Sequence, residues 1–281
     1  MRKAILLSAA LALVPALLPA RAAAAEGEGT FLLRVAKAYV GDGKCLEGGA
    51  RLMVKEGKIL SLTPDRGPLP GDCRVIDRRG CVLVPGLVAA ATGLVESRAD
   101  RPLRPDFQAV NGLDLAGYKE EILRGGITAF HIVPGRASFL PGQGSVVKPG
   151  PRKGLARIVA AGADLVFVLG EAGRFSGAVY DPELFPDEEK KLLPARREPP
   201  ASVAGQGMLF RRLMRLAKDP DTPPFIAQGR EGWSTLPLQA AARGRLPLRF
   251  ICDSSASARL AAHLAWEQGL PAVLEGGRPG A

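Results

Sequence analysis

Histidine is scarce in this chain. Only two of the 281 residues are histidines, His131 and His263. Because each imidazole ligand of a metal comes from a separate side chain, the chain alone cannot build a site of three or more imidazoles. A site of that kind would need histidines from a partner chain.

Aromatic residues are also few, since Phe, Trp and Tyr together make up 5% of the chain. The formal net charge is +10, but the basic residues are scattered, and the densest group is Arg211, Arg212 and Arg215. Proteins that bind nucleic acid combine such basic groups with aromatic side chains that stack on bases. We therefore expect no nucleic-acid partner and assign the positive charge to a solvated surface or to weak attraction to anionic envelope surfaces.

Long apolar runs are absent except at the N-terminus. A basic start at Arg2 and Lys3 is followed by residues 4–18, apolar apart from Ser8 and Pro15, and then by four alanines at 22–25. This order is typical of a secretory signal peptide, here residues 1–25, and is too short and Ala-rich for a stable membrane span. We expect an exported protein, periplasmic or secreted, with no membrane span after cleavage. An uncleaved membrane tether is the alternative.

The chain has four cysteines, Cys45, Cys73, Cys81 and Cys252. In an oxidising compartment they allow three disulfide pairings, and Cys45 with Cys73 or Cys81 is the plausible one because all three fall in the N-terminal region. No C-x-x-C spacing suggests a metal site. Free thiols are the alternative.

Glycine and proline, by contrast, are plentiful, with 34 and 24 residues, and hydrophobic residues make up 47% of the chain. These values indicate a loop-rich globular protein with a core sufficient for one large or two smaller domains. Short strands separated by turns predict a small β-sandwich domain over residues 26–84. From residue 85 to residue 281, apolar strands alternate with helices, which predicts parallel βα units and an α/β fold. The expected strands are 127–133, 165–169, 248–252 and 272–274, the expected helices 115–124, 208–218, 236–243 and 256–268, and the expected loops 98–111 and 175–204.

Motifs near the junction of these two regions resemble the amidohydrolase superfamily, the imidazolonepropionase-like metal-dependent hydrolases. Val75-Ile-Asp77-Arg-Arg-Gly80 and Val84-Pro-Gly-Leu-Val88 resemble the D-x-x-G turn and the P-G-L-[IV]-D-x-H-x-H strand of that family. Further segments resemble exported members in the same order: Gly57-Lys-Ile59, Gly126-Ile-Thr128, Gly142-Gln-Gly-Ser-Val-Val-Lys148, Leu246-Pro-Leu-Arg249 and Leu274-Glu-Gly-Gly277. The resemblance implies a TIM-like (β/α) barrel behind the sandwich and hydrolysis of C–N bonds by a metal-bound water.

The same resemblance shows which metal ligands are missing. The first histidine pair of the family aligns with Ala91 and Gly93, and the second pair aligns with Ile251 and Asp253. Asp253 alone cannot hold a catalytic zinc, which takes three protein ligands. We therefore expect no metal and no other cofactor in this chain alone, and a zinc or other divalent ion only where a partner completes the site.

The predicted elements amount to roughly half of the βα units of a complete barrel. This makes the chain an incomplete, truncated member of the family by resemblance. An open half-barrel leaves strand edges exposed, which soluble proteins usually avoid. We expect a partner, either a second copy in a homo-oligomer or a second amidohydrolase-like chain.

Three residues are weak candidates for ligand binding. His131 follows an apolar strand and could face the barrel mouth, although a hydrogen-bonded structural histidine is the favoured alternative. Gln143 and Lys148 lie in the G-Q-G-x-V-V-K segment, where Lys148 could contact an anionic group. The glycines there could equally form only a tight βα connection.

Two carboxylates are weak catalytic candidates. Glu275 lies at the carboxyl end of a strand, the functional face of such barrels, yet in the family this segment shapes the mouth. Asp253 could act with Ser254 and Ser255 as the N-cap of the next helix, which needs no catalytic role. His263 is expected on the outer surface of a helix and is assigned a structural role.

Three functions remain open from the sequence. The favoured one is a catalytically inactive amidohydrolase-like scaffold or partner subunit, a pseudoenzyme. The second is a hydrolase of amide, cyclic amide or peptide C–N bonds with an altered site or a site completed by another chain. The third is a non-catalytic binder of amides or dipeptides.

Overall fold

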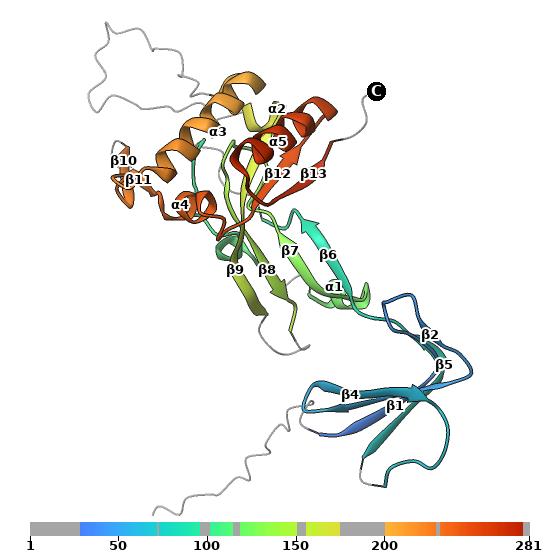
Figure 1. The fold of residues 1–281 in the computed structure, drawn as a ribbon. Coiled ribbons are helices and arrows are strands. Elements are labelled where there is room, and N and C mark those ends of the chain that lie inside the picture. Colours follow the sequence, from blue (N-terminus) through green and yellow to red (C-terminus); the bar gives the residue numbers. More distant parts are fainter. Residues whose placement is uncertain are drawn as a thin grey trace, which may run out of the picture. The chain divides into compact units, whose positions relative to one another are not determined.

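The computed structural model describes residues 29–71, 73–95, 102–114, 119–150, 156–174, 200–228 and 231–277. The chain divides into two compact units between Pro85 and Gly86, and each is described by itself (Figure 1). The predicted signal peptide lies outside the described residues, as do positions 175–199 of the second predicted loop. Within the described ranges, no helix is long and apolar enough to cross a membrane.

Unit 1 is built on a five-stranded β-sheet. Its strands are β1 (Phe31–Tyr39), β2 (Cys45–Leu46), β3 (Ala50–Lys55), β4 (Lys58–Pro64) and β5 (Arg74–Leu83). β1 pairs antiparallel with β2 and β3 and parallel with β5, and β4 extends the sheet beyond β3. The β3–β4 hairpin turns at Glu56 and Gly57, whose φ angles of 49° and 74° suit a two-residue hairpin turn.

The core of unit 1 is small. Val35, Ala38 and Ala50 are buried in it, against Leu33, Leu46, Leu62 and Leu83. The short strands predicted for this region are present, but they form a single hydrogen-bonded sheet, so the predicted sandwich is not confirmed. All four cysteines are free thiols in the structure.

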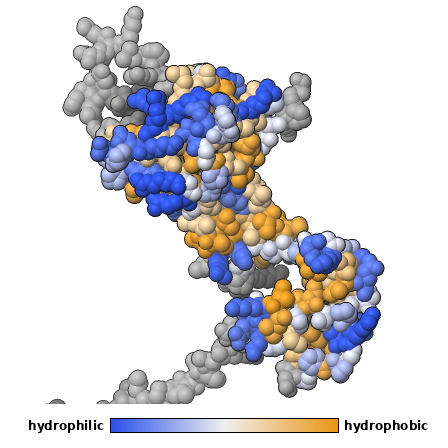
Figure 2. Space-filling model, in the orientation of Figure 1, coloured by the Kyte–Doolittle hydropathy of each residue, from blue (hydrophilic) through white to orange (hydrophobic). Residues whose placement is uncertain are grey.

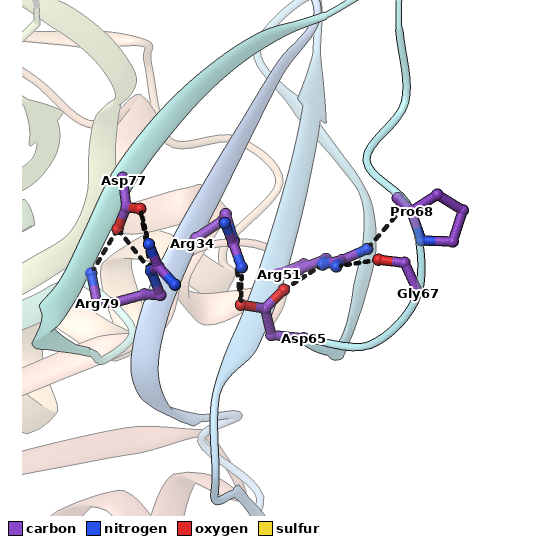
Figure 3. A network of polar contacts seen from close by, with 7 residues as sticks. All are labelled: Arg34, Arg51, Asp65, Gly67, Pro68, Asp77 and Arg79. Atoms are coloured by element: carbon purple, nitrogen blue, oxygen red, sulfur yellow. Dashed lines mark hydrogen bonds and ion pairs between the residues drawn. The ribbon is translucent and has the colours of Figure 1, made fainter.

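A carboxylate clamp joins one turn of unit 1 to its sheet (Figure 3). The Asp65 carboxylate accepts hydrogen bonds from Arg34, at 3.0 and 2.7 Å, and from Arg51. Arg51 also donates to the carbonyl oxygens of Gly67, at 2.6 Å, and Pro68, at 3.0 Å. Asp65 thus holds the chain after β4 against β1 and β3. The hydrogen bonds from Arg34 and then Arg51 lower the pKa of the Asp65 carboxyl.

Replacing Asp65 with asparagine is expected to lower the thermal midpoint of unfolding at pH 7. Because the folded-state pKa is lowered, the carboxylate stabilises the fold above its unfolded-state pKa of about 4, and this contribution is lost as the pH falls through the folded-state value. The difference between wild type and Asp65→Asn should therefore shrink in acid. Thermal denaturation between about pH 3 and pH 7 measures it. Asp42→Asn, which removes an exposed carboxylate paired locally with Lys44, is the control and should change little. Equal midpoints for wild type and Asp65→Asn at pH 7 would contradict the clamp.

Unit 2 is built on a six-stranded sheet in the order β13–β12–β9–β8–β7–β6. Its strands are β6 (Leu87–Thr92), β7 (Ile127–Ile132), β8 (Gly142–Lys148), β9 (Arg157–Leu169), β12 (Leu248–Cys252) and β13 (Ala272–Gly276). Neighbouring strands are parallel except at β8, which is antiparallel to both β7 and β9. The expectation of parallel βα units alone is therefore wrong at residues 142–148, which form a strand and not a connection. No helix lies between β7 and β8 to carry the chain back, so β8 must run antiparallel.

Helices cover one face of this sheet (Figure 1). The helices are η1 (Ala109–Gly112), α1 (Lys119–Arg124), α2 (Glu171–Arg174), α3 (Val203–Lys218), α4 (Leu236–Ala242) and α5 (Ser255–Gln268), with a small hairpin of β10 (Phe225–Gln228) and β11 (Glu231–Ser234). The main core lies between these helices and the strands β9 and β12. At its centre the Phe167 ring lies 5.4, 5.0 and 5.8 Å from the rings of Phe139, Phe210 and Phe250.

Serine side chains set where the two longest helices begin. Ser202 accepts a hydrogen bond from the backbone N–H of Gly205 at the start of α3. Ser254 forms a capping box with Ser257 at the start of α5, and Gly269, with φ 66°, caps its end after Gln268. α3 therefore begins five residues before its predicted start at 208.

Large apolar side chains are also exposed on unit 2 (Figure 2). They include Leu87 and Val88 of β6, Ile158 and Val159 of β9, Val273 and Leu274 of β13, and Trp266 of α5. β6 and β13 are the two edge strands of the described sheet.

Candidate functional site

The sheet of unit 2 has a second face, opposite to the helices, which we call the inner face. Side chains alternate along a strand, so the packing of Leu165, Phe167 and Leu169 on the helices turns their neighbours to the inner face. On β9 these neighbours include Asp164, and on the paired strand β12 they include Arg249.

A row of ion pairs crosses the inner face over four strands. His131 Nε2 of β7 lies 2.9 Å from Asp164 Oδ2 of β9, and Arg249 Nε of β12 lies 2.7 Å from the same oxygen. Arg249 Nη1 also lies 3.3 Å from Glu275 Oε2 of β13, and Arg136 contacts the other oxygen of that carboxylate. We call these five residues the ion-pair row. His131, Asp164 and Arg249 are only 7%, 4% and 8% exposed, so the centre of the row is shielded from solvent.

Gly144 makes the contact between His131 and Asp164 possible. β8 lies between β7 and β9, and Gly144 pairs with Asp164 in the ladder. A Cβ atom at residue 144 would lie 2.2 Å from Asp164 Oδ1 and 2.4 Å from His131 Nε2. The two side chains therefore meet over β8 at a position that only glycine can occupy without displacing them.

Neighbouring side chains lower the pKa of Asp164, the central carboxylate of the row. Burial alone would raise the pKa of Asp164, but contact with His131 and Arg249 outweighs it and holds this pKa below the usual value. His131 approaches the carboxylate without the alignment of a hydrogen bond, and neither of its ring nitrogens has a hydrogen-bond partner in the part of the chain that the structure describes. The structural role and the ligand-binding role of His131 therefore both stay predictions.

The positions where the resemblance places metal ligands do not fit a metal ion. Ala91 lies in β6 and Gly93 just beyond it, and neither side chain has a donor atom. Ile251 is buried in an apolar cluster with Val133, Val166 and Val168. Among the described residues, no three or more His, Cys, Asp or Glu side chains gather as a metal site. The donor set is therefore unsuited to the zinc chemistry that the resemblance implies.

At the remaining ligand position, the carboxylate of Asp253 accepts hydrogen bonds from other residues of the chain. Its Oδ2 accepts a 2.6 Å hydrogen bond from the N–H of Glu171 at the start of α2, and its Oδ1 accepts one of 3.1 Å from the Ser257 hydroxyl. Gly170 has φ +114°, and a Cβ there would lie 2.0–2.1 Å from this carboxylate. Asp253 thus ties the end of β9 to α5. It is not the N-cap of α5, a position that Ser254 holds.

Gln143 and Lys148 lie apart from the ion-pair row. Gln143 pairs with Leu165 and so faces the helix side, where its side-chain amide donates a 2.9 Å hydrogen bond to the carbonyl of Pro105. Lys148 is exposed at the end of β8. His263 is exposed on α5, with Nε2 3.8 Å from Glu267. Of the sequence-predicted site residues, only His131 and Glu275 are brought into one network, and the roles predicted for the others stay predictions.

Sequence reasoning missed three partners of these two residues, Asp164, Arg249 and Arg136, and also Gly144, over which His131 and Asp164 meet. One signal was present, because Asp164 directly precedes an apolar strand and Arg249 interrupts another. Burying a charge is costly unless it is paired, so two opposite charges within buried strands predict each other as partners.

Comparison with solved structures supports the fold. A crystal structure of an amidohydrolase from Thermotoga maritima MSB8 aligns with a TM-score of 0.67 and 22% sequence identity. The fold of this chain is amidohydrolase-like. The alignment covers 87% of this chain and 63% of that chain, so this chain spans less than two thirds of its neighbour's length. No protein-family model matches the sequence, and no curated protein matches it.

The comparison supports the predicted fold class at the level of the overall architecture. Unit 2 is a mixed α/β structure with a curled half-barrel sheet, consistent with the predicted partial TIM-like barrel. At this level of identity the similarity concerns the fold alone, and activity, substrate and partners are not carried over.

Proposed function

We propose that the protein is a catalytically inactive, amidohydrolase-like protein that is exported and acts by association, as a scaffold or partner subunit. The observation that carries this proposal is the chemistry of the ligand positions: Ala91 and Gly93 have no donor atoms, and Ile251 is part of an apolar cluster. Hydrolysis of a C–N bond in this fold type would need a metal to activate water.

The inner face further supports a structural role. Val133, Val166 and Val168 are 0–2% exposed, so a water molecule beside Ile251 would meet methyl groups and no hydrogen-bonding partner. Arg249 pairs with Asp164 and Glu275, and Arg136 pairs with Glu275, so these charged groups are partnered within the ion-pair row. Among the residues that the structure describes, no three or more His, Cys, Asp or Glu side chains gather to hold the metal that amide hydrolysis requires in this fold type.

An activity assay tests this proposal. We expect the purified protein, supplied with zinc, to hydrolyse cyclic amides and dipeptides no faster than buffer containing zinc alone. Hydrolysis that depends on zinc and is abolished by a chelator would overturn it. Thermal shifts with the same compounds separate a scaffold, which should show none, from an amide or dipeptide binder.

One observation favours a second candidate, a hydrolase whose site is completed by another chain. β6, which carries Ala91, is an edge strand of the sheet, so a partner's strand could lie directly beside it. This candidate requires a complex with an amidohydrolase-like chain that has zinc-dependent activity absent from either chain alone. Failure to obtain such a complex by co-expression would remove its support.

A further inference from the structure

Two helices of unit 2 share an outer face. The buried residues of each helix lie on the side toward the core: Gln206, Gly207, Phe210, Leu213, Met214 and Ala217 in α3, and Ser257, Ala261, Leu264 and Ala265 in α5. At about 3.6 residues per turn, the opposite side carries residues spaced i, i+4 and i+7 in both helices. They are all exposed: Met208, Arg212 and Arg215 of α3, and Arg259, His263 and Trp266 of α5. We call these six residues the α3–α5 face.

The two helices lie side by side, so the six residues form one surface (Figure 1). A Cβ atom at Gly207 of α3 would lie 3.5 Å from Leu260 Cδ1 of α5. Further along both helices, Arg211 Nε lies 2.8 Å from Glu267 Oε2. Both helices pack on the same core against β9 and β12, and their outer sides therefore both point away from the sheet.

Three guanidinium groups on this face are unpaired. Within the described ranges, no carboxylate forms an ion pair with Arg212, Arg215 or Arg259, and all three side chains are exposed. α3 contains four basic residues and no acidic one. The positive charge of the chain is thus concentrated on this side of unit 2, although the basic residues are scattered along the sequence.

The acidic groups near these arginines already have partners. Glu267, the one carboxylate of the two helices, lies 2.8 Å from Arg211 and 3.8 Å from His263. Asp219 and Asp221 lie beyond the end of α3, where Asp219 Oδ1 accepts a 3.0 Å hydrogen bond from the Asp221 N–H. The described residues therefore leave the α3–α5 face with an excess of positive charge.

Two large apolar side chains project among the arginines. Met208 is 71% exposed and Trp266 is 79% exposed. The Trp266 ring lies 5.9 Å from the His263 ring of the same helix, and most of it remains open to solvent. Tryptophan is favoured where water meets lipid, because its ring body is apolar and its N–H can stay among polar headgroups.

An anionic phospholipid surface matches this combination of groups. A guanidinium group binds a phosphate through two parallel hydrogen bonds, so three unpaired arginines suit a layer of phosphate headgroups. The apolar region directly below the headgroups can take up the side chains of Met208 and Trp266. A single-stranded nucleic acid also offers phosphates, but it needs a series of stacking side chains, and this face has one tryptophan.

We propose that the α3–α5 face binds the surface of a phospholipid bilayer with anionic headgroups. Arg212, Arg215 and Arg259 contact the phosphates, and Met208 and Trp266 reach below them. The apolar sides of α3 and α5 stay in the protein core, so the helices lie on the bilayer and do not enter it. This inference goes beyond the proposed function, because it adds a lipid partner to a protein that acts by association.

Cosedimentation of the purified protein with lipid vesicles tests the proposal. We expect binding to vesicles of equal parts phosphatidylglycerol and phosphatidylcholine, and none to phosphatidylcholine alone. The binding should be lost in about 1 M salt, where the Debye length falls to about 3 Å. The triple variant Arg212→Gln/Arg215→Gln/Arg259→Gln should lower the partition coefficient at least about tenfold, since each basic residue near such a surface contributes to binding.

A second triple variant controls for net charge. Lys55→Gln/Lys58→Gln/Arg78→Gln removes three exposed basic residues of unit 1 and changes the net charge of the chain by the same amount. Its partition coefficient should stay within about threefold of wild type. Circular dichroism verifies that both variants are folded, and the residues that they change are exposed.

Tryptophan fluorescence gives a readout that needs no change of charge. The chain has two tryptophans, and Trp233 is 7% exposed, so the emission that responds to lipid comes from Trp266. Anionic vesicles should shift the emission of wild type to shorter wavelength and leave that of Trp266→Phe unchanged.

Three results would overturn the proposal: no binding to the anionic vesicles at low salt, equal losses in the two triple variants, or tighter binding to a single-stranded oligonucleotide than to the vesicles. Each of them would leave the expected lack of zinc-dependent hydrolysis untouched. The lipid surface and the catalytic inactivity therefore fail separately.

Discussion

Replacing Asp164 with alanine is expected to lower the free energy of unfolding by about 3–5 kcal/mol. Among the described residues, the substitution removes the only carboxylate that contacts His131 and the closest one to Arg249. Because Arg249 is 8% exposed, its guanidinium cannot turn to solvent without breaking the packing around it. An incompletely paired buried cation is among the costliest defects of a protein interior.

Urea denaturation of wild type, Asp164→Ala and Asp164→Asn measures this effect. Asparagine keeps the shape and a hydrogen-bond acceptor but not the charge, so its loss should be intermediate. The double variant Asp164→Ala/Arg249→Leu should recover part of the stability, because removing both partners leaves no unpaired charge between them. A loss below about 1 kcal/mol for Asp164→Ala would show that the ion-pair row does not hold the inner face together.

Replacing Ile251 with histidine is expected to lower the free energy of unfolding by about 3 kcal/mol or more. This change introduces the imidazole that the family resemblance places at this position. In this chain it removes a buried aliphatic side chain from contact with Val133, Val166 and Val168, and it buries polar nitrogens where those neighbours offer no hydrogen bond. Residue 251 is part of the apolar core of this chain, so an imidazole there should act as a defect.

Ile251→Val is the matched control and should cost only about 0.5–1.5 kcal/mol, because it removes one methylene group. Thermal denaturation with and without zinc compares the three proteins. Zinc should not restore the stability of Ile251→His, since Ala91 and Gly93 supply no further ligand. A histidine variant as stable as wild type, or one stabilised by zinc, would contradict this account of the site.

Much of unit 2 could be predicted because its elements have local signals. β12 coincides with its predicted range of 248–252, and α5 ends at Gln268 before the glycine that terminates it, as predicted. The predicted start of α3 was late because its cap, Ser202, lies before an apparently weak helical stretch rich in glycine. Local composition places the start of such a helix too late, because the capping side chain determines where the helix begins.

β8 and the ion-pair row could not be predicted from local pattern. Glycine disfavours strands, so residues 142–148 suggested a connection, yet Gly144 is a strand residue because His131 and Asp164 meet over it. Asp164 and Arg249 are 85 residues apart in the chain, and periodicity contains no information on contacts of that separation. That Ala91 and Gly93 offer no metal ligand, by contrast, follows from the sequence, since alanine and glycine side chains lack donor atoms in any conformation.

The central proposal is that this chain by itself holds no catalytic metal, and the metal content of the purified protein tests it most directly. The protein is dialysed to equilibrium against zinc, and zinc per chain is then measured by elemental analysis. Wild type should retain well below one zinc per chain, and Asp253→Asn should retain the same amount. Retention of one or two zinc ions per chain, reduced by Asp253→Asn, would contradict the account.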